Sequence, residues 1–188
     1  MRELAILTFT SLDGVMQAPR LPEGDPAGGF RGGWAAPYWE EVMPHVAKHA
    51  MASPYDLLLG RRTYDLFFAH QGSDPSSPMS AATKFVVTSS PNTLRWANSV
   101  ALTGDVESEV TRLKNQDGPL LQVHGSWKLI QALLAHDLVD EFRIWTFPVL
   151  VGSGKRLFSA ERLPPRLRLR ATEAVGVSGV VMQIYRRH

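Results

Sequence analysis

The sequence contains no cysteine, and this absence excludes several chemistries at once. Disulfides, thiolate metal sites and cysteine nucleophiles all need the missing residue. No apolar stretch approaches the roughly 20 residues of a membrane-spanning helix. The apolar run at 4–9 is too short for a signal peptide and follows Glu3. We therefore expect a cytoplasmic protein that has no membrane partner and folds as one domain over 1–188.

Motifs of several other enzyme classes are also missing. The segment 151–156 resembles the end of a phosphate-binding P-loop, but Val149 replaces its first glycine and Arg156 its Ser or Thr. Leu157 occupies the third glycine position of a dinucleotide-binding fingerprint. No G-x-S-x-G motif and no zinc-deaminase signature is present, which argues against a serine hydrolase and a deaminase.

Positive charge is concentrated near the end of the chain. Residues 155–188 hold 8 of the 20 Lys and Arg but only 2 of the 18 Asp and Glu. From Arg166 to Ala171, arginine alternates with an apolar residue. This period of two is typical of a half-buried strand with one wet face, and no nucleic-acid motif accompanies it. We therefore favour a solvated edge strand here and expect no nucleic-acid partner.

Apolar runs separated by breakers predict an α/β domain. Strands are expected at 3–10, 55–59, 84–88, 99–102 and 120–124, within a β-rich run at 140–151, and in a hairpin at 166–175 and 179–186. Helices are expected at 37–51, 61–69, 105–114 and 126–136, with Asp105 as the N-cap of the third. Loops are expected at 11–36 and 70–80. The alternation of strands and helices indicates a mainly parallel sheet with an antiparallel C-terminal hairpin.

Three of these strands end in small or basic polar groups. In open α/β sheets, ligands bind beyond the carboxyl ends of the strands, and helix N-termini bind phosphate. The groups that follow the three strands are Gly60, Arg61, Arg62 and Thr63, then Thr88, Ser89 and Ser90, and finally Gly125 and Ser126. Together they predict a sheet edge suited to a ligand with several phosphates.

Two further groups of residues could belong to a pocket or to a metal site. Trp34, Tyr38 and Trp39 lie where the long loop meets the first helix, either in the core or as the wall of a substrate pocket. Glu41, His45 and His49 are spaced four apart and would share a helix face. Zinc needs a further ligand and no HExxH motif is present, so we favour a solvated face and expect no metal site.

The chain resembles the dihydrofolate reductase fold, and most closely its riboflavin-biosynthesis reductase branch. The resemblance rests on SLDG at 11–14, GRRTY at 60–64, VTSS at 87–90, VHGSWKLIQALL at 123–134 and LVDEFRIWTFPVLVGSGKRLF at 138–158. It extends over nearly the whole chain and implies a three-layer α/β fold.

The resemblance also implies a function: an NADPH-dependent reductase, commonly homodimeric, that acts on a small molecule. Arg61, Arg62 and Thr63 would hold phosphate, and Thr88, Ser89 and Ser90 would lie near the adenosine 2′-phosphate. The other implied cofactor contacts are Gly60, Met16, Gly125, Ser126 and Leu129. Asp13 would be the catalytic residue, and Gly14, Val15, Trp34 and Trp39 would join it around the substrate. The glycine-rich loop 14–33 would close over the site as a lid.

Other features of the sequence leave the activity and the assembly open. Glu40 and Glu41 do not align securely with the carboxylate that handles the pterin in dihydrofolate reductases, which argues against folate as the substrate. No proton donor is securely placed either, so a non-catalytic ligand-binding module on the same fold is the alternative. The region 140–151 is the expected dimer interface.

Overall fold

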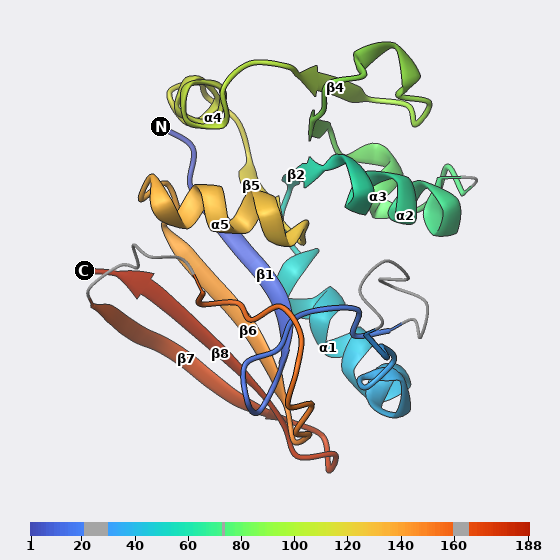
Figure 1. Ribbon diagram of the computed structural model, residues 1–188, viewed down its shortest axis with the longest axis vertical. Coiled ribbons are helices and arrows are strands. Elements are labelled where there is room, and N and C mark those ends of the chain that lie inside the picture. The colour runs from blue at the N-terminus through green and yellow to red at the C-terminus, as the bar shows by residue number, and fades with distance from the viewer. Residues whose placement is uncertain (21–29, 73, 160–165) are drawn as a thin grey trace.

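The computed structural model describes residues 1–20, 30–72, 74–159 and 166–188. Its central feature is a sheet in the order β4-β3-β2-β5-β1-β6-β8-β7 (Figure 1). Strands β1 to β6 run parallel, and β8 and β7 close the sheet as an antiparallel hairpin. The predicted mainly parallel sheet with an antiparallel C-terminal hairpin is therefore confirmed.

The boundaries of the predicted strands and helices lie within two residues of the expected ones, apart from the β-rich run that follows the last helix. The short helix α3 (Pro78–Ala81) lies where a loop was expected at 70–80. The strands are β1 (Leu4–Ser11), β2 (Tyr55–Gly60), β3 (Lys84–Val87), β4 (Ser99–Leu102), β5 (Leu120–Val123), β6 (Glu141–Phe147), β7 (Leu167–Val175) and β8 (Val180–Arg187). The helices are α1 (Trp39–Ala50), α2 (Arg61–Gln71), α3 (Pro78–Ala81), α4 (Val106–Lys114) and α5 (Trp127–Ala135), with short 3-10 turns at Ala36–Tyr38 and Pro91–Thr93. Asp105 caps α4 as predicted, because its carboxylate accepts from the Ser108 N–H.

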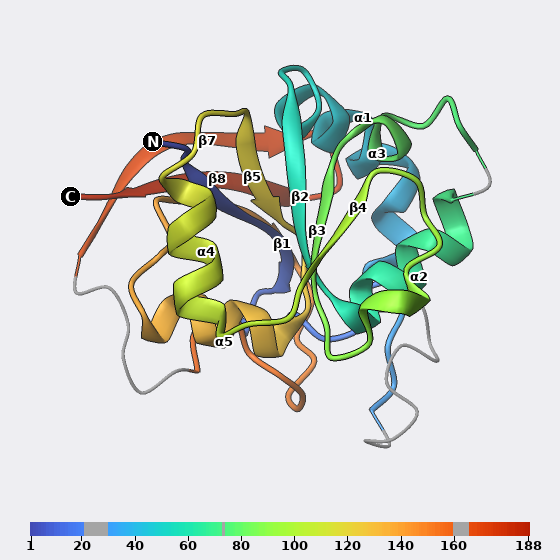
Figure 2. The same cartoon turned by 90° about the horizontal axis from the view of Figure 1, so that it is seen from above.

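The helices form a layer on each face of the sheet (Figure 2). On one face, α4 and α5 pack over β1, β5 and β6 through residues such as Val110 and Leu133. On the other face, α1 packs over β1, β6 and β8, and α2 and α3 cover β2 and β3. Apolar residues alternate between these faces along β2. Leu58 packs on the face covered by α4 and α5, and Leu57 packs on the face covered by α2 and α3. This arrangement leaves the carboxyl edge of the parallel strands available for a site.

Two features of the later strands differ from the predicted pattern. The β-rich run 140–151 ends as a strand at Phe147, and β6 lies inside the sheet between β1 and β8. It therefore has no free edge for strand pairing, and the dimer interface expected at 140–151 stays a prediction. The segment 166–175 forms a solvated edge strand as expected, because β7 is the outermost strand. Its half-buried alternation is absent, since Leu169 and Ala171 are exposed like the arginines beside them and a register shift lies between the two.

The expected lid 14–33 lies partly outside the described residues, because 21–29 fall there. Two hydrogen bonds connect the described ends of this loop. The Gly33 N–H donates to the Ala18 carbonyl, and the Trp34 indole donates to the Gln17 carbonyl. Across the described parts of the chain, every helix is too short or too polar to cross a membrane.

Candidate functional site

The strand ends that the sequence assigns to phosphate lie along one edge of the sheet, and the centre of this edge is a tight contact between the ends of β2 and β5. The Gly60 N–H donates to the Gly125 carbonyl at 3.4 Å. A Cβ on Gly60 would lie 1.9 Å from Ser126 Oγ, and a Cβ on Gly125 would lie 2.9 Å from Thr63 Oγ1. Gly125 also has a φ of +146°, and the Gly125–Ser126 peptide is cis. Both positions therefore require glycine for the two strand ends to meet.

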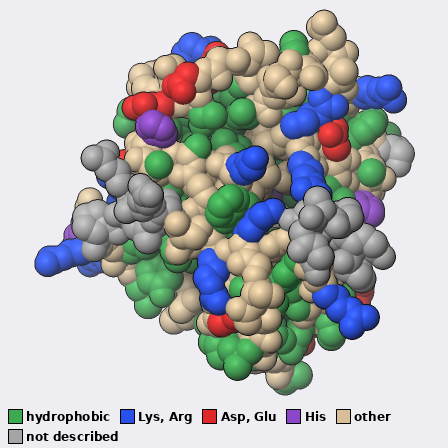
Figure 3. Space-filling view, in the orientation of Figure 1, with side chains coloured by type: hydrophobic (Ala, Val, Ile, Leu, Met, Phe, Trp, Pro, Cys, Tyr) green, Lys and Arg blue, Asp and Glu red, His purple; other side chains and the backbone are tan. Residues whose placement is uncertain are grey.

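Beside this contact lies an open cleft of about 840 Å³, between the start of α2 and the ends of β3 and β4. Arg61 reaches across it. Its guanidinium donates to the Asp65 carboxylate at 2.9 Å, to the Ser90 carbonyl at 3.4 Å and to Thr93 Oγ1. The cleft is lined by Arg61, Asp65, Val87, Thr88, Ser89, Ser90, Thr93, Leu102, Thr103, Gly104 and Lys128. Basic side chains border this region between α5 and α2 (Figure 3).

The structure brings together only part of the predicted set at this cleft. Arg61 and the hydroxyl residues Thr88, Ser89 and Ser90 line it, whereas Arg62 is exposed and not among the lining residues. Thr63 packs against the backbone of Gly125 instead. These positions follow from the helix, which turns successive side chains about 100° apart.

Sequence reasoning missed several residues of this cleft, among them Thr103, Gly104 and Lys128. Thr103 and Gly104 follow β4 as Thr88 and Ser89 follow β3, so the strand-end rule applied to β4 would have found them. Lys128 lies in the first turn of α5, where only the spatial approach of α5 to the other strands makes it a site residue.

Asp13 is held in a network that closes the loop after β6. One carboxylate oxygen accepts from Ser11 Oγ at 2.7 Å and from the Val151 N–H at 3.1 Å. The other accepts from the Gly152 N–H at 2.8 Å and lies 3.5 Å from the Arg156 guanidinium. The Ser11 hydroxyl and then these backbone N–H groups hold the pKa of Asp13 far below its usual range. Asp13 is therefore a fixed carboxylate and not a proton donor near neutral pH.

The residues after Asp13 pair with the same loop. The Met16 N–H donates to the Lys155 carbonyl, and the Leu157 N–H donates to the Gly14 carbonyl. Val15 is fully buried, and Met16 packs in the core that also contains Leu129 and Leu157. Val15 and Met16, which the resemblance assigns to substrate and cofactor contacts, are thus core side chains that present little surface of their own.

The aromatic residues at the start of α1 belong to the core on that face of the sheet. The Trp34 and Tyr38 rings each meet the Phe147 ring edge to face at 5.5 Å, and the Trp39 ring meets Phe9 in the same way. Trp34 and Trp39 remain partly exposed, and the Arg20 guanidinium lies 5.0 Å above the Trp39 ring. They are thus packed on one side and accessible on the other.

His124 follows β5 immediately before Gly125. Gln122 Nε2 donates to the Ala50 carbonyl, so Gln122 Oε1 is the atom that faces His124 Nε2 at 3.0 Å. His124 Nε2 therefore carries the proton, and Nδ1 is an acceptor. Burial, and then the nearby Arg143, lower the pKa of His124 to about 4. The ring is neutral at physiological pH.

The expectation of a solvated face holds for Glu41, which is exposed, and is wrong for His45 and His49. Glu41 accepts from the backbone N–H groups of Val177 and Ser178. The two histidine side chains are only 11% and 21% exposed, because they pack against Glu173 on β7. The register that places β7 over α1 could not be read from the helix alone.

Comparisons with known proteins agree with this architecture. The model of the family described as the RibD C-terminal domain matches residues 2–181. Two uncharacterized proteins of Bacillus subtilis (strain 168) are similar in sequence. YwjB is 29% identical over 64% of this chain and 67% of its own length. YyaP is 28% identical over 69% of this chain and 72% of its own length.

Two solved structures share the fold. One is described as a candidate riboflavin biosynthesis protein from Shewanella sp. PV-4, with a TM-score of 0.64, 21% identity and 100% and 99% of the two chains covered. The other is dihydrofolate reductase from Enterococcus faecalis complexed with NADP(H), with a TM-score of 0.62, 16% identity and coverage of 99% and 96%.

Proposed function

The chain belongs to the RibD C-terminal domain family, and on that basis we propose that it is an NADPH-dependent reductase. The substrate would be a small heterocyclic, carbonyl or imine compound that accepts a hydride. The single observation that supports this most strongly is the cleft at the carboxyl edge of the sheet. It combines two cationic side chains, Arg61 and Lys128, with the hydroxyls of Thr88, Ser89 and Ser90.

The residues present fit a dinucleotide phosphate. Gly60 and Gly125 let backbone approach backbone beside the N-terminus of α5, where phosphate is favoured. Arg61 and Lys128 supply positive charge, and hydroxyls supply hydrogen-bond donors. Such a set suits the extra 2′-phosphate that distinguishes NADPH from NADH. In this proposal Arg61, Thr88, Ser89 and Ser90 hold that group, while Gly125 and Ser126 face the pyrophosphate.

The reduction itself divides between cofactor and protein. When bound, the nicotinamide supplies the hydride, and the protein supplies binding, orientation and exclusion of water. The ionised Asp13 keeps the 148–157 loop against the end of β1, next to the buried Val15 and Met16. Trp34 and Trp39 offer partly exposed rings on which a flat substrate would stack.

The substrate class is proposed from the family. The riboflavin-biosynthesis branch acts on a ribosylated aminopyrimidine phosphate, and an activity like that of 5-amino-6-(5-phosphoribosylamino)uracil reductase is the first one to test. We further propose that the protein is a homodimer, because large apolar side chains are exposed next to the site. Leu12 is 65% and Leu150 77% exposed.

A non-catalytic binding module is the second proposal, and one observation favours it. Asp13 stays ionised far below neutral pH, so the acid predicted from sequence cannot deliver a proton to a reduced substrate. A module of this kind would bind the nucleotide without consuming it.

The experiment that tests both proposals is a titration of the purified protein with NADPH and with NADH, followed by quenching of its 5 tryptophans. NADPH should bind more tightly than NADH. Arg61→Ala should weaken NADPH about tenfold, as expected for one charge-assisted contact in a partly exposed cleft, and should weaken NADH less. Arg62→Ala is the matched comparison and should have the smaller effect, since Arg62 does not line the cleft.

Equal losses for both cofactors would mean that Arg61 does not recognise the 2′-phosphate. Failure to bind either cofactor would contradict the cofactor assignment itself. NADPH oxidation in the presence of aminopyrimidine, carbonyl or imine substrates separates a reductase from a binding module.

A further inference from the structure

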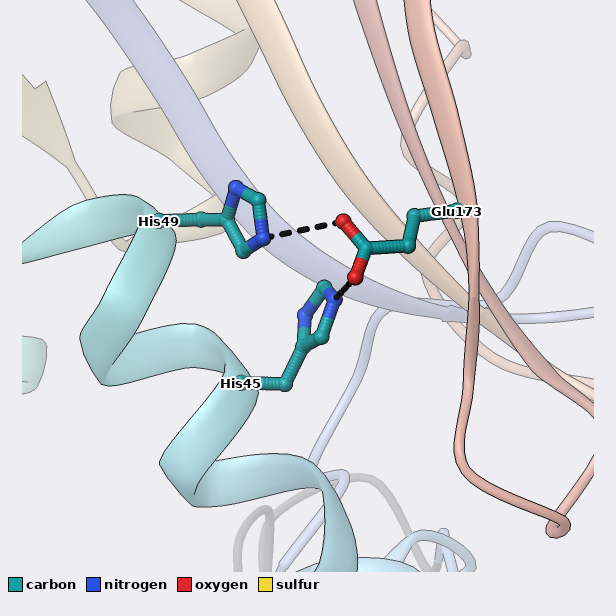
Figure 4. Close-up of side chains that lie close together, drawn as sticks. All are labelled: His45, His49 and Glu173. Carbon is teal, nitrogen blue, oxygen red and sulfur yellow. Dashed lines mark ion pairs between the residues drawn. The ribbon is translucent and has the colours of Figure 1, made fainter.

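A second cluster of chemically active side chains lies away from the cofactor cleft, between α1 and the edge strand β7. It consists of His45 and His49, one turn apart on α1, and Glu173 on β7 (Figure 4). Both rings point toward the same carboxylate. His45 Nε2 lies 3.2 Å from Oε1 of Glu173, and His49 Nε2 lies 3.1 Å from Oε2.

These distances match those between the ligands of a small divalent cation. Zinc bonds to histidine nitrogen and carboxylate oxygen are about 2.0–2.1 Å long, so two tetrahedral ligands lie about 3.3 Å apart. The three ligand atoms all lie within 4.8 Å of one another. The two imidazole rings are 4.3 Å apart and inclined by 30°, and each points its Nε2 toward Glu173.

The two Nε2 atoms are buried, and neither has a hydrogen-bond partner of acceptable geometry. Each is close to a carboxylate oxygen, but that oxygen does not lie along the N–H direction. Buried polar atoms normally find such a partner.

We propose that His45, His49 and Glu173 form a binding site for Zn²⁺ or a neighbouring late first-row divalent cation. Glu173 is 43% exposed, so the remaining coordination positions open to water. Glu41 does not contribute, because it binds the turn between β7 and β8. The bound ion would fasten α1 to the edge strand. The proposal is independent of the reductase activity.

A hydrogen bond from Trp145 to His45 provides a specific test of this site. The buried indole N–H of Trp145 donates to His45 Nδ1 at 3.2 Å. A metal at Nε2 requires the proton of His45 to move to Nδ1, where it would face the indole N–H. Trp145 thus opposes metal binding, and Trp145→Phe should tighten it by about tenfold, since one unfavourable buried contact disappears.

The test uses the full chain without a polyhistidine tag, freed of metal by a chelator. Calorimetric titration with Zn²⁺ should give one site per chain, and Zn²⁺ should raise the melting temperature because it binds only the folded state. Co²⁺ should give the visible absorption of a nitrogen- and oxygen-ligated ion. His49→Gln and Glu173→Gln should each weaken Zn²⁺ binding by about a hundredfold or more.

His136→Gln is the matched control, because His136 pairs with Glu107 at 2.9 Å in an exposed histidine–carboxylate contact elsewhere. It should leave Zn²⁺ affinity unchanged. The proposal is overturned if wild-type protein gives neither one-site Zn²⁺ binding nor a Co²⁺ spectrum. It is equally overturned if His49→Gln and Glu173→Gln bind Zn²⁺ as wild type does, and the three residues then form a metal-free contact.

Discussion

Gly60 is the residue on which the cofactor cleft depends most directly. A Cβ there would lie 1.9 Å from Ser126 Oγ, at the point where the ends of β2 and β5 meet. We expect Gly60→Ala to lower the free energy of unfolding by about 1–3 kcal/mol, because the strand ends must separate. NADPH affinity should fall with it. Denaturant unfolding and the tryptophan titration measure the two effects, and Gly152→Ala is the control, since its added Cβ meets nothing within 4 Å.

Gly152 has a φ of +81°, so its substitution carries backbone strain without the clash. A Gly60→Ala variant that binds NADPH normally would show that the strand-end contact does not shape the cleft.

Lys84 predicts a dependence of stability on pH. Its side chain is fully buried, with Nζ donating to the carbonyls of Met79 and Ser80 and lying 4.6 Å from the Trp96 ring. Burial lowers the pKa of Lys84 to about 8, against about 10.4 in the unfolded chain. Between these values the unfolded state binds one more proton than the folded state. The contribution of Lys84 to stability therefore rises with pH in this window.

The measurement is the free energy of unfolding of wild type and Lys84→Met between pH 7.5 and 9.5. Wild type should gain about 2 kcal/mol relative to the variant as the pH rises. Lys48→Met, at an exposed position on α1, should show the same pH dependence as wild type. A gain of equal size in all three proteins would assign the effect to other groups.

The loop after β6 is held to the end of β1 by one carboxylate. Asp13 accepts from Ser11, Val151 and Gly152 together. We expect Asp13→Ala to release this loop, so that the reduction rate falls while NADPH affinity is kept. Asp13→Asn should retain part of the rate, because an amide oxygen still accepts one or two of these bonds. Unchanged turnover in Asp13→Ala would remove Asp13 from the site, and loss of folding would be visible in circular dichroism.

The positions of most helices and strands could be predicted from the sequence, but which of them pack against one another could not. Apolar runs ended by breakers placed β2 and β4, and an Asp before an apolar helical pattern placed the cap of α4. The exposure of Leu169 depends on β7 being outermost, which no local pattern records. For the same reason Lys128 and Glu173 escaped attention, since each meets its site only through packing between distant segments.

Assembly is a property of the whole molecule, and the exposed apolar residues near the site make it testable. Leu12 and Leu150 lie on joined loops, because the Leu12 N–H donates to the Val149 carbonyl at 2.9 Å. If they form the dimer contact, Leu150→Glu should convert the protein to a monomer, since a charge would be buried in the interface. Sedimentation measures the mass. Val177→Glu, at a fully exposed turn, should leave it unchanged.

A wild-type protein that sediments as a monomer would contradict the proposed homodimer. A dimer that survives Leu150→Glu would place the contact on another surface.

The position of β1 in the sheet has a consequence for how the chain is made. The first strand to leave the ribosome lies between β5 and β6, so Leu4 pairs with Leu121 and Ala5 with Glu141. Until those late strands emerge, both edges of β1 remain unpaired and its apolar side chains have no core to enter. Such long-range pairing slows folding and prolongs exposure of aggregation-prone strands. We therefore expect the core around β1 to form only after β5 and β6 have emerged, and chains that stop before β6 to aggregate.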